Sequence, residues 1–190
     1  MLEKEITTPD YYPMSLNALT NACNQKSNRD PVVSYDDELV QHGCDTLRHK
    51  GLLTVVSGAG SRVSKFAHRF AEKLNLGRRE TAILCELLVR GPQTVGEIRN
   101  RTERLHRFPD LEEVQSLLDR MPQFVVKLPR RAGEKEVRYA HLLCGPVDFT
   151  ETEAHVPAPA RAKLEDELAS LREEVEELKR QFAAFRRQFE

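Results

Sequence analysis

Residues 52–68, LLTVVSGAGSRVSKFAH, decide the fold that the sequence predicts. An apolar, β-branched run comes first, a Gly-rich turn follows, and a second alternating run closes the stretch, which is typical of a β-hairpin. Residues 124–141, FVVKLPRRAGEKEVRYAH, repeat the design. The strings KFAH (65–68) and RYAH (138–141) match chemically and lie 73 residues apart. The chain is therefore expected to hold two hairpins of one kind.

A helical segment precedes each hairpin. In the first copy it is YDDELVQHGCDTLRHKG (35–51), with Ser34 as the expected N-cap. In the second copy it is LEEVQSLLDRM (111–121), with Asp110 as the N-cap. The apolar residues of this second segment fall on one helical face, as Leu111, Val114, Leu118 and Met121.

Shorter helices come before these. SLNALTNAC opens at Ser15, and TVGEIRNRT opens at Thr94 with Glu97 three residues later, which is a capping box. The second copy has one more helix, GRRETAILCELLVRG, with Ile83, Leu84, Leu87 and Leu88 on its apolar face. Three helices and a hairpin, given twice, predict two tandem winged-helix domains, 1–75 and 76–144. The predicted class is mainly α with small β-hairpins (α+β).

The C-terminal residues predict a coiled coil. After a Pro-containing linker (145–160), apolar residues recur at alternating steps of three and four through 161–190. The seam consists of Leu164, Leu168, Leu171, Val175, Leu178, Phe182 and Phe185. A parallel homodimer would place Glu167 of one chain opposite Arg172 of the other, and Glu174 opposite Lys179. The alternative is a helix that folds back on its own domain.

The stretch NACNQKSNRDPV (21–32) is polar and lies where the second helix turns toward the third. Asn, Asp and Ser side chains bond nearby amides, and Pro31 ends any helix before it, so the stretch is interpreted as a turn held by its own side chains. The alternative is that Lys26, Asn28 and Arg29 face a partner such as a phosphate backbone.

This stretch and both hairpins carry a resemblance. With KEITTPDYYPMSLNALTNACNQKSNRDPV, LLTVVSGAGSRVSKF and FVVKLPRRAG in view, the chain resembles the YceH-like family of bacterial tandem winged-helix proteins, whose biochemical role is unassigned. In that family most of a first helix precedes the segment matching LEKEI, and Met1 falls near the end of that helix. We expect a start codon assigned too late, the alternative being a first domain that lacks one wall of its core.

Winged-helix domains suggest DNA binding, and the hairpins are basic. Residues 46–71 contain no acid, and RNRTERLHR (99–107) adds further cations. Phosphates attract such clusters. The residues predicted to contact DNA in a transcriptional regulator are Lys26, Asn28, Arg29, Lys50, Arg62, Lys65, Arg99, Arg101, Lys127, Arg130, Arg131, Lys135 and Arg138.

The third helices favour another partner. They open with Asp36, Asp37 and Glu38 in the first copy and with Asp110, Glu112 and Glu113 in the second. Acids at a helix N-terminus suit the helix dipole but would face the phosphates of a duplex. With a net charge of −1, the chain also fits a protein-interaction scaffold, for which the kleisin-binding subunits of chromosome-organising complexes are an analogy by fold alone.

Other classes have little support. No GxSxG, P-loop or HExxH string occurs, so no enzyme and no cofactor are expected. Cys23, Cys44, Cys85 and Cys144 lack metal-site spacing and are expected to be buried, reduced thiols of a cytoplasmic protein. His68 and His141 share a strand face with the preceding aromatic residue and are interpreted as packing residues.

The heptads generate the first testable prediction. Removing residues 157–190 should convert a dimer into a monomer, because the apolar seam that joins the two helices is lost. Light scattering on the full and shortened chains measures the mass directly. A monomeric full chain would contradict the coiled-coil prediction.

Overall fold

The computed structural model describes residues 1–56, 63–130 and 133–145, together with Val175 and Lys179. The chain divides into two compact units, Met1–Phe149 and Thr150–Glu190. In the second unit, Val175 and Lys179 have helical backbone, and Val175 is exposed. The linker from 146 onward and the other predicted dimerisation residues lie outside the described residues, namely Leu164, Leu168, Leu171, Leu178, Phe182 and Phe185. The coiled coil therefore stays a prediction.

The first half of the first unit combines short helices with a three-stranded antiparallel sheet. Its elements are α1 (Leu2–Thr7), the 3-10 helix η1 (Pro9–Tyr11), β1 (Met14–Ser15), α2 (Leu16–Cys23), α3 (Asp37–His49), β2 (Leu53–Val56), β3 (Lys65–His68) and α4 (Phe70–Leu74). The strand order is β1-β3-β2, and Phe66 lies opposite both Met14 and Val55. The strands of the first predicted hairpin are thus confirmed, whereas its turn (57–62) lies outside the described residues.

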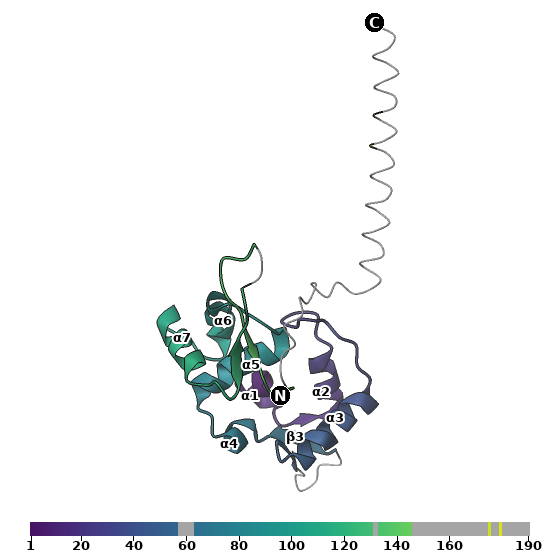
Figure 1. Cartoon of the computed structure of the whole chain (residues 1–190). Helices are drawn as coiled ribbons and strands as arrows, with labels where there is room; N and C mark the ends of the chain where they lie inside the picture. The colour runs from purple at the N-terminus through teal and green to yellow at the C-terminus, as the bar shows by residue number, and fades with distance from the viewer. Residues whose placement is uncertain (57–62, 131–132, 146–174, 176–178, 180–190) are drawn as a thin grey trace, which may run out of the picture. The chain divides into compact units, whose positions relative to one another are not determined.

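The second half repeats this order with fewer strands. Its elements are α5 (Arg78–Arg90), α6 (Val95–Arg101), the 3-10 helix η2 (Thr102–Arg104), α7 (Leu111–Asp119), β4 (Val125–Lys127) and β5 (Tyr139–His141). β4 and β5 pair antiparallel, and Gln93 forms a single bridge to Tyr139, at the place that β1 takes in the first half. The predicted mixed α+β class with small hairpins is confirmed for the described residues (Figure 1).

Side-chain caps fix where the helices start. The predicted N-caps of α2, α6 and α7 are confirmed, and these are Ser15, Thr94 and Asp110. The predicted cap of α3 is wrong: the carboxylate of Asp36, and not Ser34, accepts the Leu39 amide at 2.8 Å. The reason is a contact outside the helix, because the Asn24 amide bonds both the N–H and the C=O of Tyr35, each at 2.7 Å. Those two bonds leave the backbone at Tyr35 outside the helix.

Each half of the first unit has its own apolar core. The smaller one, in the first half, contains Met14, Leu19, Ala22, Val40, Cys44, Leu53 and Phe66. The larger one contains Phe70, Ile83, Leu84, Leu87, Ile98, Phe108, Val114, Leu117, Leu118, Met121, Val125 and Tyr139. Phe70 and Leu52 come from the first half of the chain yet pack in this larger core. Leu111 and Leu88, expected on buried faces, are 47% and 37% exposed.

Helix α1 packs on the second half. Its apolar residues Leu2 and Ile6 contact a small buried cluster of Ala82, Cys85 and Leu105, and α1 lies beside α5 (Figure 1). Met1 packs instead against the first core. Residues 1–149 form one compact unit, so the predicted division at residue 75 does not coincide with a break in packing and stays a prediction.

The four cysteines are free, as predicted, but not all are buried. Cys44 and Cys85 are buried, and burial raises the pKa of the Cys85 thiol to about 12. Cys23 is half-buried and Cys144 is exposed, so the prediction is wrong for Cys144. That residue follows β5 in a short turn and is exposed with respect to the described residues.

The polar stretch 21–32 ends α2 at Cys23 and then forms a turn, as interpreted from its residues. Asn28 adopts the left-handed conformation with φ 57°, which Asn tolerates better than most residues. Its side-chain oxygen accepts a hydrogen bond from Arg90, and the backbone N–H of Asp30 donates to the Val89 carbonyl at 2.9 Å. The turn is therefore fastened to the C-terminal end of α5.

Arg29 connects the same turn to α1 and α2. Its guanidinium pairs with Glu3 at 2.7 Å and donates to the Ala22 carbonyl at 3.0 Å and to Gln25 Oε1 at 3.1 Å. Only 11% of the Arg29 side chain is exposed. Of the three residues predicted here as partner contacts, Arg29 and Asn28 are engaged within the chain. Lys26 is exposed and makes no ion pair with the described residues.

Replacing Arg29 tests this assignment. Arg29→Ala should lower the free energy of unfolding by about 3 kcal/mol, because it leaves the largely buried Glu3 carboxylate without its partner. Lys26→Ala, in the same turn but exposed, should change it by less than about 0.5 kcal/mol. Chemical denaturation measures both values. Equal, small effects would mean that Arg29 has no structural role.

Candidate interaction surfaces

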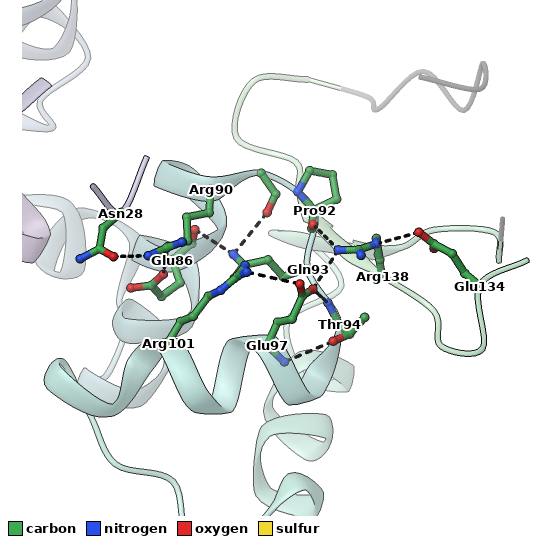
Figure 2. A network of polar contacts seen from close by, with 11 residues as sticks. Asn28, Glu86, Arg90, Pro92, Gln93, Thr94, Glu97, Arg101, Glu134 and Arg138 are labelled. Atoms are coloured by element: carbon green, nitrogen blue, oxygen red, sulfur yellow. Dashed lines mark hydrogen bonds and ion pairs between the residues drawn. The ribbon is translucent and has the colours of Figure 1, made fainter. Parts of the chain in front are cut away.

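Glu97 joins the second hairpin (124–141) to α6. Its carboxylate completes the predicted capping box by accepting the Thr94 N–H at 2.9 Å. It also pairs with Arg138 at 2.8 Å and with Arg101 at 3.3 Å (Figure 2). Burial would raise the pKa of Glu97, but the Thr94 N–H and the two guanidinium groups outweigh it and lower the pKa below its ordinary value. The ionised carboxylate is thus the stable form near neutral pH.

Arg138 and Arg101, both predicted to bind DNA, hold parts of the chain in place. Arg138 also donates to the Pro92 carbonyl at 3.2 Å and to Glu134 Oε1 at 3.3 Å. Arg101 donates to Gln93 Oε1 at 2.8 Å. Both guanidinium groups are therefore largely satisfied by the protein itself (Figure 2).

Gln93 is a residue that the sequence analysis missed. It is 1% exposed, and its side chain donates to the Glu86 carbonyl at 3.0 Å. Its backbone N–H and C=O both bond to Tyr139, at 3.0 and 2.7 Å. A lone Gln after Gly-Pro gives no periodic signal, so only the bridge to β5 reveals its role.

The remaining predicted cations fall into three groups. Arg99 donates to the Pro109 carbonyl at 3.0 Å and is partly covered. Five are exposed and make no ion pair with the described residues: Lys50, Lys65, Lys127, Arg130 and Lys135. Arg62 and Arg131 lie outside the described residues. The five exposed cations lie on the two hairpins or on the residues next to them.

Some of the acidic residues in the first turns of α3 and α7 make contacts within the protein. Asp36 and Asp110 are N-caps, Asp37 accepts a hydrogen bond from Thr20, and Glu113 pairs with Arg79 at 2.7 Å. Glu38 and Glu112 are exposed and make no ion pair with any described residue. Acidic charge therefore persists on the surface of both helices.

An open pocket of about 830 Å³, here called the α7 pocket, lies between α7, the start of α6 and the second hairpin. It is lined by Val95, Gly96, Leu111, Glu112, Gln115, Ser116, Asp119, Arg120, Lys135, Glu136 and Val137. Gln115 bonds to the Tyr139 hydroxyl at 2.7 Å and to Asp119 at 2.8 Å, which ties α7 to β5. The pocket therefore has fixed walls, apolar side chains and three carboxylates.

The two histidines predicted to be packing residues are both partly covered. His68 lies 2.9 Å from Glu5 of α1, and its backbone N–H donates to the Tyr12 hydroxyl at 2.6 Å. Burial lowers the pKa of His68, although Glu5 opposes this, and burial alone lowers that of His141. Within the described residues there is no group of three or more His, Cys, Asp or Glu placed to hold a metal ion. In the same part of the chain, no helix has the length and apolar character needed to cross a bilayer.

Comparison with known proteins shows the family to which the chain belongs. The family model "Protein of unknown function, DUF480" matches residues 1–134. A UPF0502 protein of Solibacter usitatus is 57% identical over 192 residues, covering 100% of this chain and 93% of the relative. UPF0502 proteins of Citrifermentans bemidjiense and Vibrio parahaemolyticus are 51% and 48% identical, covering 92% and 95% of this chain and 83% and 90% of their own lengths. The resemblance stated from the sequence is confirmed: the chain belongs to the DUF480 (UPF0502) family of bacterial proteins.

Proposed function

We propose that the chain is a non-enzymatic tandem winged-helix protein that binds another protein through the α7 pocket. Helix, short extended segment, two helices and two strands occur in both halves, which is the winged-helix order. In such a domain the third helix and the hairpin border the usual contact surface. The α7 pocket lies at that place, and its chemistry is the observation that carries the proposal.

The charges around this pocket favour a polypeptide over a duplex. Glu112, Asp119 and Glu136 line it, against Arg120 and Lys135. The acidic start of α7 would meet phosphates at short range, where like charges repel. Two cations that would have offset this repulsion, Arg101 and Arg138, are paired with Glu97.

The same lining indicates the character of the partner segment. Val95, Leu111 and Val137 offer apolar contact, and Leu111 is 47% exposed. Exposed apolar side chains beside carboxylates suit a segment that carries both apolar and basic residues. Contacts of Glu97 and Gln115 hold the walls of the pocket in place, so binding should cost little conformational entropy of the protein.

A pair of matched peptides tests this function. A short amphipathic peptide of Leu and Lys should bind, whereas the same peptide with Glu in place of Lys should not, as measured by fluorescence polarisation. Glu112→Lys combined with Asp119→Lys should weaken binding by about tenfold or more, since both carboxylates become repulsive cations.

Glu103→Lys, an exposed reversal on η2 away from the α7 pocket, is the control and should leave the affinity unchanged. Equal binding of both peptides, or no loss in the double reversal, would overturn the proposal.

Contact of the hairpins with duplex DNA is the second candidate. The observation that favours it is the set of exposed cations on or next to the hairpins, namely Lys50, Lys65, Lys127, Arg130 and Lys135. A dimer formed through the predicted coiled coil would present two such sets. Phosphate contact through hairpins alone would be independent of base sequence.

Gel retardation at several salt concentrations tests DNA binding. Contact of about six cations with phosphates predicts a log–log salt slope of roughly −5. Reversing Arg62, Lys65, Arg130 and Arg131 to Glu should abolish retardation. Arg78→Glu, an exposed reversal on α5, should not. Retardation that is unchanged in the fourfold variant would discard the hairpin contact.

A further inference from the structure

A second, more enclosed pocket lies where α1 and the polar turn meet α5, α6 and η2. Its volume is about 270 Å³, and we call it the junction pocket. Its polar lining includes Asn28, Glu86, Arg90, Asn100, Arg101 and Arg104. These six come from the polar turn, from α5 and from the continuous stretch of α6 and η2, so the pocket exists only in the folded chain. Two further carboxylates line it, Glu3, which pairs with Arg29 at 2.7 Å, and Glu103, which lies 4.0 Å from Arg107.

Glu86 is the unusual residue of this pocket. Only 9% of its side chain is exposed, and burial raises the pKa of its carboxyl group above the ordinary value. Its Oε2 lies 3.3 Å from Nε of Arg90, yet neither atom has a hydrogen-bond partner of acceptable geometry among the described residues. A buried carboxylate oxygen without a donor is unfavourable, so this atom is a site for a donor from a bound molecule.

The guanidinium groups supply the complementary chemistry. Arg90 already bonds to Asn28 and lies beside Glu86 (Figure 2). Arg104 makes no ion pair or hydrogen bond with the part of the chain that the structure describes, and the amide of Asn100 is equally free there. Arg104 and Asn100 are thus two donors available for acidic oxygens, on the side of the pocket formed by α6 and η2.

We propose that the junction pocket binds a small organic acid that also carries a hydroxyl or ammonium donor. The acidic group, a carboxylate or a phosphate, accepts from Arg104 and Asn100, and the donor bonds to Oε2 of Glu86. A volume of about 270 Å³ admits a metabolite with a short carbon chain. This site is separate from the α7 pocket and does not depend on the function proposed for it.

Isothermal titration with defined probes tests the proposal. Glycerate and glycerol 3-phosphate each carry both groups, whereas acetate carries only the acid and glycerol only the donor. At least one of the first two should bind with a Kd of about 1 mM or tighter, and neither of the others should. The comparison of glycerate with glycerol 3-phosphate distinguishes carboxylate from phosphate recognition.

Two variants locate the binding. Arg104→Ala removes an exposed cation that has no partner among the described residues, and it should weaken binding by about tenfold. Arg78→Ala removes an exposed cation of α5 outside the pocket; it is the matched control and should have no effect. Side-chain amide NMR signals of Asn28 and Asn100 should shift on binding in the unmodified chain. Absence of binding by both two-group probes, or equal effects of the two Arg variants, would overturn the proposal.

Discussion

The carboxylate of Glu97 is the contact on which both candidate surfaces depend. It caps α6 through the Thr94 N–H, and it pairs with Arg138 on one side and Arg101 on the other. Arg138 fixes the second hairpin, one wall of the α7 pocket. Arg101 lines the junction pocket. The Arg138 and Arg101 side chains are 29% and 35% exposed, so each ion pair contributes little to the free energy of unfolding. Their main effect is to fix the positions of the second hairpin and of α6.

Internal pairing changes what the charge of this chain means. Counted along the sequence, the Arg residues of 99–107 and 138 form a basic surface for phosphates. In the folded chain Arg101, Arg138 and Arg29 each pair with a carboxylate of the same chain. Their charge is neutralised at short range. Among the described residues predicted to contact DNA, the exposed cations without an ion pair are Lys26, Lys50, Lys65, Lys127, Arg130 and Lys135. With the paired arginines neutralised, the carboxylates of the α7 pocket contribute more to the charge of that surface, which favours a protein partner there.

Local patterns predicted the elements well, because each depends on residues close in sequence. The caps at Ser15, Thr94 and Asp110 and the strands of both hairpins follow from such patterns. Contacts between distant segments could not be predicted in this way. The packing of α1 on α5 and the placement of Glu86 depend on how the first and second halves of residues 1–149 meet. Asp36, and not Ser34, caps α3 because Asn24 bonds the backbone of Tyr35.

The polar turn 21–32 shows how local and distant effects combine. Its Asn and Asp residues suit a turn, as the sequence indicated, but the same side chains also reach the second half. Asn28 orients Arg90 beside Glu86, and Arg29 holds Glu3 of α1 against the same region. The turn thus builds one side of the junction pocket. A molecule bound there would contact α1, the turn and α6 together, and through Arg101 and Glu97 it would be linked to the hairpin that borders the α7 pocket. Glu97 lines neither pocket, but its two ion pairs join Arg101 of the first pocket to Arg138 of the hairpin that borders the second.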